Sequence, residues 1–169
     1  MNIFILDENP ELCAQYHCDK HVVKMILESA QLLATAVQEK ARIEGLYKPT
    51  HRNHPCGIWT RRSRANFLWL GELAKQLCIE YTFRYKKDHK SLDMIKKCLD
   101  LQELVQPGSL TPFAKAMPDE YRNDGIVESY RKYYIGEKSG ILCYTRRDIP
   151  IWLRMAGVGF RKVEEQLLS

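Results

Sequence analysis

The side chains best suited to chemistry are concentrated in residues 17–31. At the pitch of an α-helix, His21, Lys24 and Glu28 lie on one stripe, and Gln31 extends it. Imidazole titrates near neutral pH, and a partly buried carboxylate beside a lysine can act as an acid, a base or a ligand. The spacing therefore predicts acid/base catalysis by His21 and Glu28.

An exposed helix face is the simpler interpretation of the same stripe, because Lys24 and Glu28 have the spacing of an ordinary surface ion pair. Met25 and Leu32 fall within the stripe, however, so this side is not expected to be fully solvated. The opposite side is expected to pack in the core through Val22, Val23, Ile26, Ala30, Leu33 and Val37.

A second group of histidines follows in residues 45–55, where a glycine and two prolines interrupt the helical pattern. His54 is predicted as a second acid/base group or as a ligand. Histidines four apart on a helix can chelate one ion. The residues of this metal-binding alternative are His17, His21, His54 and Glu28. No His-Glu-x-x-His motif and no paired Glu-x-x-His motif occurs, so the sequence predicts neither a metal nor a cofactor.

Basic residues gather in three clusters, at 61–64, 84–87 and 144–147, and the formal net charge is +5. Such clusters suit a polyanion such as nucleic acid or a nucleotide phosphate, but they also describe solvated helix ends. Tyrosines among cations in residues 126–138 can stack bases and hold phosphates, although packing is the commoner role of such tyrosines. The predicted ligand-binding residues are Lys24, Gln31, Trp59, Asn66, Tyr81, Arg84, Tyr130, Arg131, Tyr134 and Lys138.

Hydrophobic periodicity predicts an all-α protein, a single domain over residues 1–169 built as a bundle of about five or six helices. The helix with His21 starts at Asn9-Pro10 and runs toward Lys40, either unbroken or with a new start at Asp19. Only an unbroken helix places His17 on the His21 stripe. Further helices are expected from Pro55 to Arg84, from about Ser91 to Val105, from Ile126 to about Lys138, and from Leu153 to Leu168. Two long proline-containing loops, 45–55 and 106–118, separate them.

The composition is that of a folded globular protein, with 45% hydrophobic residues and no run of the roughly 20 apolar residues that cross a bilayer. The first residues lack the features of a signal peptide. We therefore expect a soluble protein of the cytoplasm with no membrane partner. The six cysteines form no Cys-x-x-Cys pair, so they are expected to be core residues rather than zinc ligands.

The end of the chain resembles a DNA-binding element. Residues 155–163, Met-Ala-Gly-Val-Gly-Phe-Arg-Lys-Val, are similar to the Gly-hydrophobic-Gly turn of helix-hairpin-helix modules. The resemblance implies that residues 150–169 are a tail whose turn amides contact backbone phosphate.

A longer resemblance covers Met1 to Trp152. Its motifs are residues 17–31, Asn53-His54-Pro55 with Trp59, Asn66 and Trp69, residues 116–121, and Tyr130-Arg131-x-Tyr133-Tyr134. The pattern resembles a family of small, largely uncharacterised proteins of tailed phages. It implies a phage origin, in the cytoplasm of the host cell, and small phage proteins of this kind act on DNA, on nucleotides or against host defence.

These observations favour a phage enzyme that acts on DNA or a nucleotide by acid/base chemistry, through glycosidic cleavage, phosphodiester cleavage or base modification. One alternative is a non-catalytic anti-defence protein that sequesters a nucleotide signal or blocks a host protein. A metal-dependent hydrolase is the second alternative.

Overall fold

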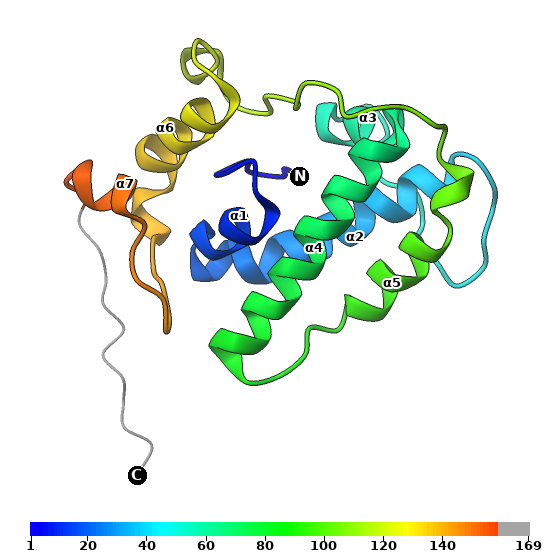
Figure 1. Ribbon diagram of the computed structural model, residues 1–169, viewed down its shortest axis with the longest axis horizontal. Helices are drawn as coiled ribbons and strands as arrows, with labels where there is room; N and C mark the ends of the chain where they lie inside the picture. The colour runs from blue at the N-terminus through cyan, green and yellow to red at the C-terminus, as the bar shows by residue number, and fades with distance from the viewer. Residues whose placement is uncertain (159–169) are drawn as a thin grey trace.

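The computed structural model describes residues 1–158, and in them the protein is entirely helical, as the sequence predicts. Figure 1 shows the helices gathered into one domain. The seven α-helices of the described part are α1 (Pro10–Tyr16), α2 (Asp19–Gln38), α3 (Pro55–Arg62), α4 (Arg64–Tyr85), α5 (Leu92–Asp100), α6 (Ile126–Lys138) and α7 (Ile151–Met155). Three short 3₁₀ turns occur at Gln102–Leu104, Asp119–Tyr121 and Ser139–Ile141.

The two longest helices, α2 and α4, pack against each other and form the centre of the fold (Figure 1). Neither contains proline, and apolar side chains recur along both, as expected of helices stabilised by burial. Helix α1 packs on α4, α3 contacts both central helices, and α5 packs in the angle between α2 and α4. The core face predicted for α2 is buried except at Val23, which is 41% exposed, so that assignment was wrong.

The chain breaks between α1 and α2, which answers the question left open at Asp19. His17 and Cys18 are extended, and α2 begins at Asp19 with Cys18 as its N-cap. Tertiary contacts replace the missing helical hydrogen bonds, because Cys18 N donates to the Tyr134 hydroxyl (3.1 Å) and Asp19 N donates to Cys143 O (2.8 Å). His17 therefore does not share the His21 stripe.

A second break divides the helix predicted from Pro55 to Arg84. Ser63 is extended, and its hydroxyl accepts a hydrogen bond from Asn66 N at the start of α4 (3.1 Å). The amide of Arg64 donates to Gln106 O (2.8 Å), so the second proline-containing loop supplies the partner that a continuous helix would have supplied. The prediction of one helix was therefore wrong.

The first residues form a buried extended arm. Ile3, Phe4, Ile5 and Leu6 are each at most 4% exposed, and Phe4 adopts a left-handed backbone conformation (φ 54°). Figure 1 shows this arm between α6 on one side and α1, α2 and α4 on the other. The arm is therefore part of the core, and α6 covers it.

The later elements agree with the sequence in part. Helix α6 has the predicted bounds, and the helix expected over 91–105 ends at Asp100 before a 3₁₀ turn. Helix α7 ends at Met155, and most of the helix predicted to Leu168, with the helix-hairpin-helix-like turn beyond Val158, lies outside the described residues. Within residues 1–158, no helix is long and apolar enough to cross a membrane.

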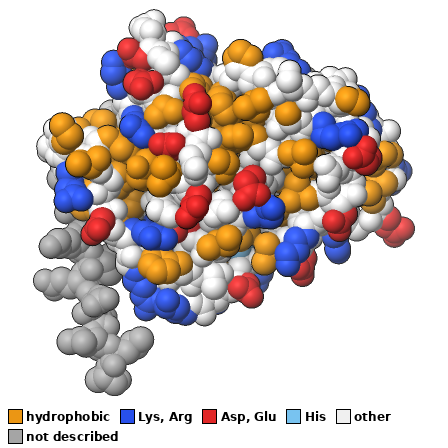
Figure 2. Space-filling view, viewed as in Figure 1, with side chains coloured by type: hydrophobic (Ala, Val, Ile, Leu, Met, Phe, Trp, Pro, Cys, Tyr) orange, Lys and Arg blue, Asp and Glu red, His pale blue; other side chains and the backbone are white. Residues whose placement is uncertain are grey.

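The surface carries charges of both signs. Figure 2 shows lysine, arginine, aspartate and glutamate side chains scattered over one face with hydrophobic side chains between them. All six cysteines are free thiols, and five of them are buried, as predicted.

Candidate active site

Glu28 is a nearly buried carboxylate in the middle of α2, 8% exposed. Its Oε2 accepts a hydrogen bond from Asn2 N (2.9 Å) and lies 3.6 Å from the amine of Met1. Its Oε1 lies 3.5 Å from Lys24 Nζ, whose side chain is 67% exposed. A single carboxylate therefore contacts a primary amine, a backbone amide and a lysine that reaches solvent.

The contact with the amine depends on Asn2, which is itself buried. Asn2 Nδ2 donates to Ala116 O (2.7 Å), and its Oδ1 accepts from Ile3 N (2.8 Å) and from the Tyr130 hydroxyl (3.0 Å). The same hydroxyl accepts from Ala116 N (3.2 Å). We call Asn2, Ala116 and Tyr130 the arm clamp, because together they fix the direction in which the first residues meet Glu28.

The sequence did not identify Met1 or Asn2 as site residues. The apolar run that follows them, Ile3 to Leu6, indicates that this segment is buried, but a run of this kind does not say what it is buried against. The contact with Glu28 could be found only from the fold.

His21 lies in an aromatic cluster next to the arm. Its ring stacks on Phe4 (centroids 4.4 Å apart), and its Nδ1 is 2.7 Å from the Tyr134 hydroxyl. Burial, followed by the nearby His17, Lys138 and Lys24, lowers the pKa of His21 to about 3. The imidazole is therefore neutral at neutral pH, and it holds Phe4 in place. Its catalytic role stays a prediction.

His17 is fully buried away from the Glu28 stripe. Its Nδ1 donates to Cys13 O (2.7 Å), and its Nε2 has no hydrogen-bond partner within the described residues. Burial is the main cause that lowers the pKa of His17 to about 4.

His54 lies at the start of α3, close to the Glu28 site. Its Nδ1 accepts from Cys56 N (3.1 Å), which leaves the proton of the neutral ring on Nε2. Burial lowers its pKa, the Met1 amine and His51 lower it further, and Glu28 opposes the shift. The fold thus brings His54, the N-cap of α3, within range of the charge of Glu28 on α2.

The four cations predicted to hold an anion occupy different environments. Arg84 is buried and bonded to Asp19 (2.9 Å) and Glu80 (2.7 Å). Arg131 donates to Leu6 O and Asp7 (2.9 and 3.3 Å). Lys138 lies over the Tyr133 ring, and Lys24 is exposed. Arg84 and Arg131 are therefore bonded to groups of the protein. Lys24 and Lys138 are near enough to His21 for their charges to lower its pKa.

Two of the predicted ligand-binding residues, Asn66 and Trp59, anchor the loop 106–118. Asn66 bonds through its side chain to Trp59 O (2.8 Å) and to the amide and hydroxyl of Thr111 (2.9 and 2.7 Å). Trp59 Nε1 donates to Thr111 O (3.3 Å). Elsewhere, Tyr81 packs on Tyr85 and His89, and the half-buried Gln31 lies on α2. Their role in ligand binding stays a prediction.

The metal-binding alternative is not supported. No three His, Cys, Asp or Glu side chains in residues 1–158 form a group that could hold a metal ion. The set His17, His21, His54 and Glu28 is not brought together in the described residues, because the helix break directs His17 to Cys13 and the Tyr134 hydroxyl contacts His21 Nδ1.

Fold and site together define a class of protein: an all-helical protein with a buried carboxylate beside a primary amine, a pair suited to proton transfer and nucleophilic attack. Residues 1–94 match the family described as pyrimidine dimer DNA glycosylase. The match covers more than half of the chain, so the protein belongs to this family. No curated protein and no solved structure matches it.

Membership supports an enzyme that acts on DNA, and it favours glycosidic cleavage among the reactions predicted from the sequence. The matched range includes Glu28, His54 and Asn2. It does not include Ala116 or Tyr130, which complete the arm clamp.

Proposed function

We propose that the protein is a DNA glycosylase that breaks the bond between one pyrimidine of a dimer and its sugar, with Glu28 and the Met1 amine as the reacting pair. The two bases of a dimer are joined covalently, so the base that leaves its sugar stays attached to the neighbouring pyrimidine. We call this glycosidic cleavage base release. The observation that carries the proposal is the 3.6 Å distance between the amine nitrogen and Oε2 of a carboxylate that is 8% exposed. A primary amine can attack an electrophilic carbon only after it loses a proton, and Glu28 is placed to accept that proton.

The proposed reaction begins when the free amine nitrogen forms a bond to C1′ of the damaged nucleotide. The bond between C1′ and the base nitrogen breaks, and its electron pair leaves with the base, which takes up a proton. A second proton then leaves the amine nitrogen, a C=N bond forms, and the C1′–O4′ bond opens with protonation of O4′. Water hydrolyses the resulting imine and regenerates the amine.

The other predicted residues have separate roles in this proposal. His54 tunes the charge around Glu28 and the amine, and His21 supports Phe4 and thereby the arm. Lys24 and Lys138 attract the DNA phosphates. Glycosylases draw the target nucleotide out of the duplex, and a dimer is already poorly paired, which lowers the cost of that step.

The test is base release from a duplex oligonucleotide that contains one pyrimidine dimer, with the undamaged duplex as the substrate control. Because the cleaved pyrimidine stays joined to its neighbour, the product is measured as an alkali-labile abasic site. Sodium borohydride reduces an imine to a stable amine, so it converts the intermediate into a covalent protein–DNA adduct. We expect base release, and an adduct that peptide mass spectrometry maps to Met1. Intact mass before the reaction checks that Met1 carries the free amine.

Glu28→Gln is the informative variant, and Glu39→Gln is its matched control. Glu39 is the C-cap of α2 and pairs with the exposed Arg52 (2.9 Å). Within the described residues, its side chain forms no ion pair with the arm. We expect base release to be lost in Glu28→Gln and retained in Glu39→Gln. No base release by the wild-type protein would refute the glycosylase, whereas release without an adduct would refute the amine as nucleophile.

The remaining expectations from the sequence stay predictions. These are a phage origin, a host-cell cytoplasmic location, action on a free nucleotide, and a host defence protein or signal as partner. Family membership favours DNA over a free nucleotide as the substrate. Intact nucleotide recovered from the denatured protein at equal stoichiometry, without base release from DNA, would favour the non-catalytic alternative.

A further inference from the structure

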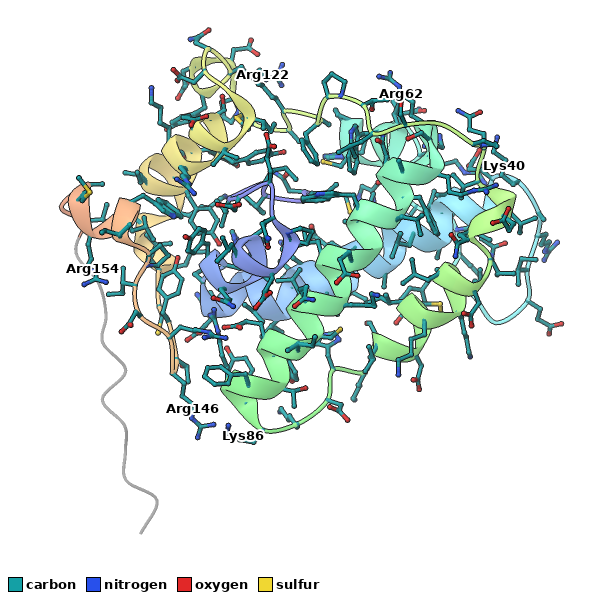
Figure 3. The ribbon with its side chains drawn as sticks, in the orientation of Figure 1. Lys40, Arg62, Lys86, Arg122, Arg146 and Arg154 are labelled. Carbon is teal, nitrogen blue, oxygen red and sulfur yellow. The ribbon has the colours of Figure 1, made fainter. Side chains whose placement is uncertain are left out.

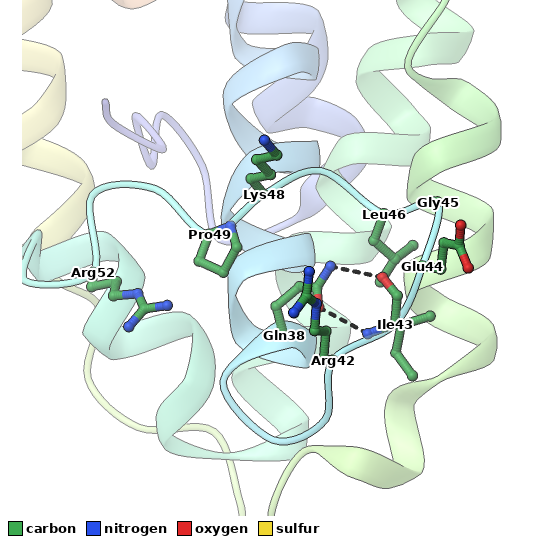
Figure 4. Close-up of a pocket in the computed structure, with 9 residues that line it drawn as sticks. All are labelled: Gln38, Arg42, Ile43, Glu44, Gly45, Leu46, Lys48, Pro49 and Arg52. Carbon is green, nitrogen blue, oxygen red and sulfur yellow. Dashed lines mark hydrogen bonds between the residues drawn. The ribbon is translucent and has the colours of Figure 1, made fainter.

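The loop between α2 and α3, residues 39–54, encloses a hollow of about 990 Å³ together with the end of α2. Figure 4 shows the side chains around it. The lining residues are Gln38, Arg42, Ile43, Glu44, Gly45, Leu46, Lys48, Pro49 and Arg52. Three of them are cations and one is a carboxylate, so the hollow is basic.

Hydrogen bonds to α2 fix the shape of this loop. The Gln38 side chain donates to Ile43 O and accepts from Ile43 N, both at 2.9 Å (Figure 4). One turn earlier on α2, the Thr35 hydroxyl accepts from Thr50 N (3.1 Å). Since both ends of the loop are tied to the same helix, the backbone that carries its cations is ordered before any ligand arrives.

Two of the three cations have no carboxylate partner. Arg42 and Lys48 are exposed, and neither forms an ion pair within residues 1–158. Arg52 pairs with Glu39, but its side chain is 62% exposed, so this pair is weak and easily replaced. Glu44 lies at the far end of the loop from Arg52 in Figure 4. The three cations are therefore available to an external anion.

The loop leads directly into the site proposed for base release. His54 follows Arg52 by two residues, and the charges of Glu28 and the Met1 amine shift its pKa. Arg61 on α3 donates to Arg52 O (2.7 Å) and adds a further positive charge beside it. A strand of DNA whose damaged nucleotide is at Glu28 could thus continue along this loop.

We propose that the α2–α3 loop binds backbone phosphates of duplex DNA next to the damaged nucleotide through Arg42, Lys48 and Arg52. The proposal rests on the proposed function, because DNA glycosylase activity is what makes DNA the anion. Guanidinium groups form two hydrogen bonds to one phosphate, and phosphate contacts set the register of a protein on DNA without reading its sequence.

The test is the salt dependence of binding to an undamaged duplex and to the same duplex with one dimer. The loop variant is Arg42→Gln/Lys48→Gln/Arg52→Gln. The comparison variant, Lys86→Gln/Lys87→Gln/Lys90→Gln, removes the same charge at the end of α4, which Figure 3 shows far from Lys40 and Arg62. Circular dichroism and thermal unfolding check that both variants are folded.

Each phosphate contact contributes about 0.9 to the slope of log K against log salt concentration, so we expect the slope of the loop variant to fall by about 2–3. The slope of the comparison variant should stay within about 0.5 of wild type. A wild-type slope in the loop variant, or an equal loss in the comparison variant, would overturn the proposal. Binding to undamaged duplex does not require base release, so this result is distinguishable from a failure of the proposed function.

Discussion

Helix α2 carries two carboxylates whose surroundings differ, the partly buried Asp19 and the buried Glu28. Asp19, at the start of the helix, accepts from Arg84 (2.9 Å), Thr145 N (2.9 Å) and the Thr145 hydroxyl (2.8 Å). The Arg84 side chain is fully buried, and the network continues through Glu80 to Arg147 (2.9 Å). We call this set the Asp19 network. Glu28 contacts only chain-end groups and a mostly exposed lysine among the described residues.

The difference is in what the partners of each carboxylate can do. The cations of the Asp19 network come from α4 and from the segment after α6, so they join distant elements, and each is bonded to a carboxylate of the protein. The partners of Glu28 are a terminal amine and an exposed ammonium group, both of which can exchange protons. The proposal for Glu28 therefore depends on the nature of its partners and not on its burial alone.

The largest expected effect is loss of catalysis on removing the Glu28 charge. Glu28→Gln should lower kcat/KM for dimer-containing DNA by at least about a thousandfold, because proton transfer by a positioned carboxylate contributes on this scale. Its free energy of unfolding should change by less than about 1 kcal/mol, since Gln keeps an acceptor for Asn2 N. Kinetics and urea unfolding measure the two quantities. Normal turnover in Glu28→Gln would show that Glu28, like Asp19, is not needed for the reaction.

The opposite pattern is expected at the Asp19 network. Arg84→Met should lower the free energy of unfolding by about 3 kcal/mol or more, because the partly buried Asp19 and the buried Glu80 remain without their cation. Per folded molecule, base release below the unfolding transition should be unchanged. Lys75→Met breaks an exposed pair with Glu72 and should cost only about 0.5 kcal/mol. Equal losses in Arg84→Met and Lys75→Met would show that the network is not structural.

Acid should destabilise the protein through the two buried histidines beside the start of α2, His17 and His21. The folded pKa values of His17 and His21 are about 4 and about 3, below the ordinary 6.5, so the unfolded chain binds more protons than the folded one as pH falls below 6.5. Stability is therefore full above pH 6.5 and is lost progressively toward pH 3. His17→Asn should recover about 2 kcal/mol of the loss between pH 7 and pH 4.5. Urea unfolding at each pH measures it, and an unchanged profile would assign the loss to the carboxylates instead.

The smallest expected effect concerns the arm clamp. Tyr130→Phe removes the hydroxyl that contacts Asn2 and Ala116, so the amine is held less well and kcat should fall about tenfold at unchanged KM. Burial raises the Tyr130 pKa, so this hydroxyl stays protonated at neutral pH. Tyr144→Phe is the control, because it removes a hydroxyl that bonds to Tyr16 O (2.9 Å) near the Asp19 network. A similar fall in kcat in both variants would mean that the clamp has no positioning role.

Local patterns were sufficient for much of the fold. The helical periodicity of residues 19–38 and 126–138, the Asn9-Pro10 start and the proline-containing loops all predict the observed elements. The breaks at His17–Cys18 and at Ser63 were ambiguous or missed, because the amides they free are satisfied by residues distant in sequence. Hydrophobic periodicity describes consecutive residues of one helix, so it does not predict hydrogen bonds to residues elsewhere in the chain.

The sequence by itself determined an all-helical fold and placed Glu28, Lys24 and His21 together, because helical pitch is a property of consecutive residues. Only the tertiary structure decided which groups each charge contacts. It brought the Met1 amine and Asn2 to Glu28, paired Arg84 with Asp19 and Glu80, and buried His17 against Cys13. Proton exchange and ion pairing depend on the distances between groups and on their access to water, which the packing of separate segments sets.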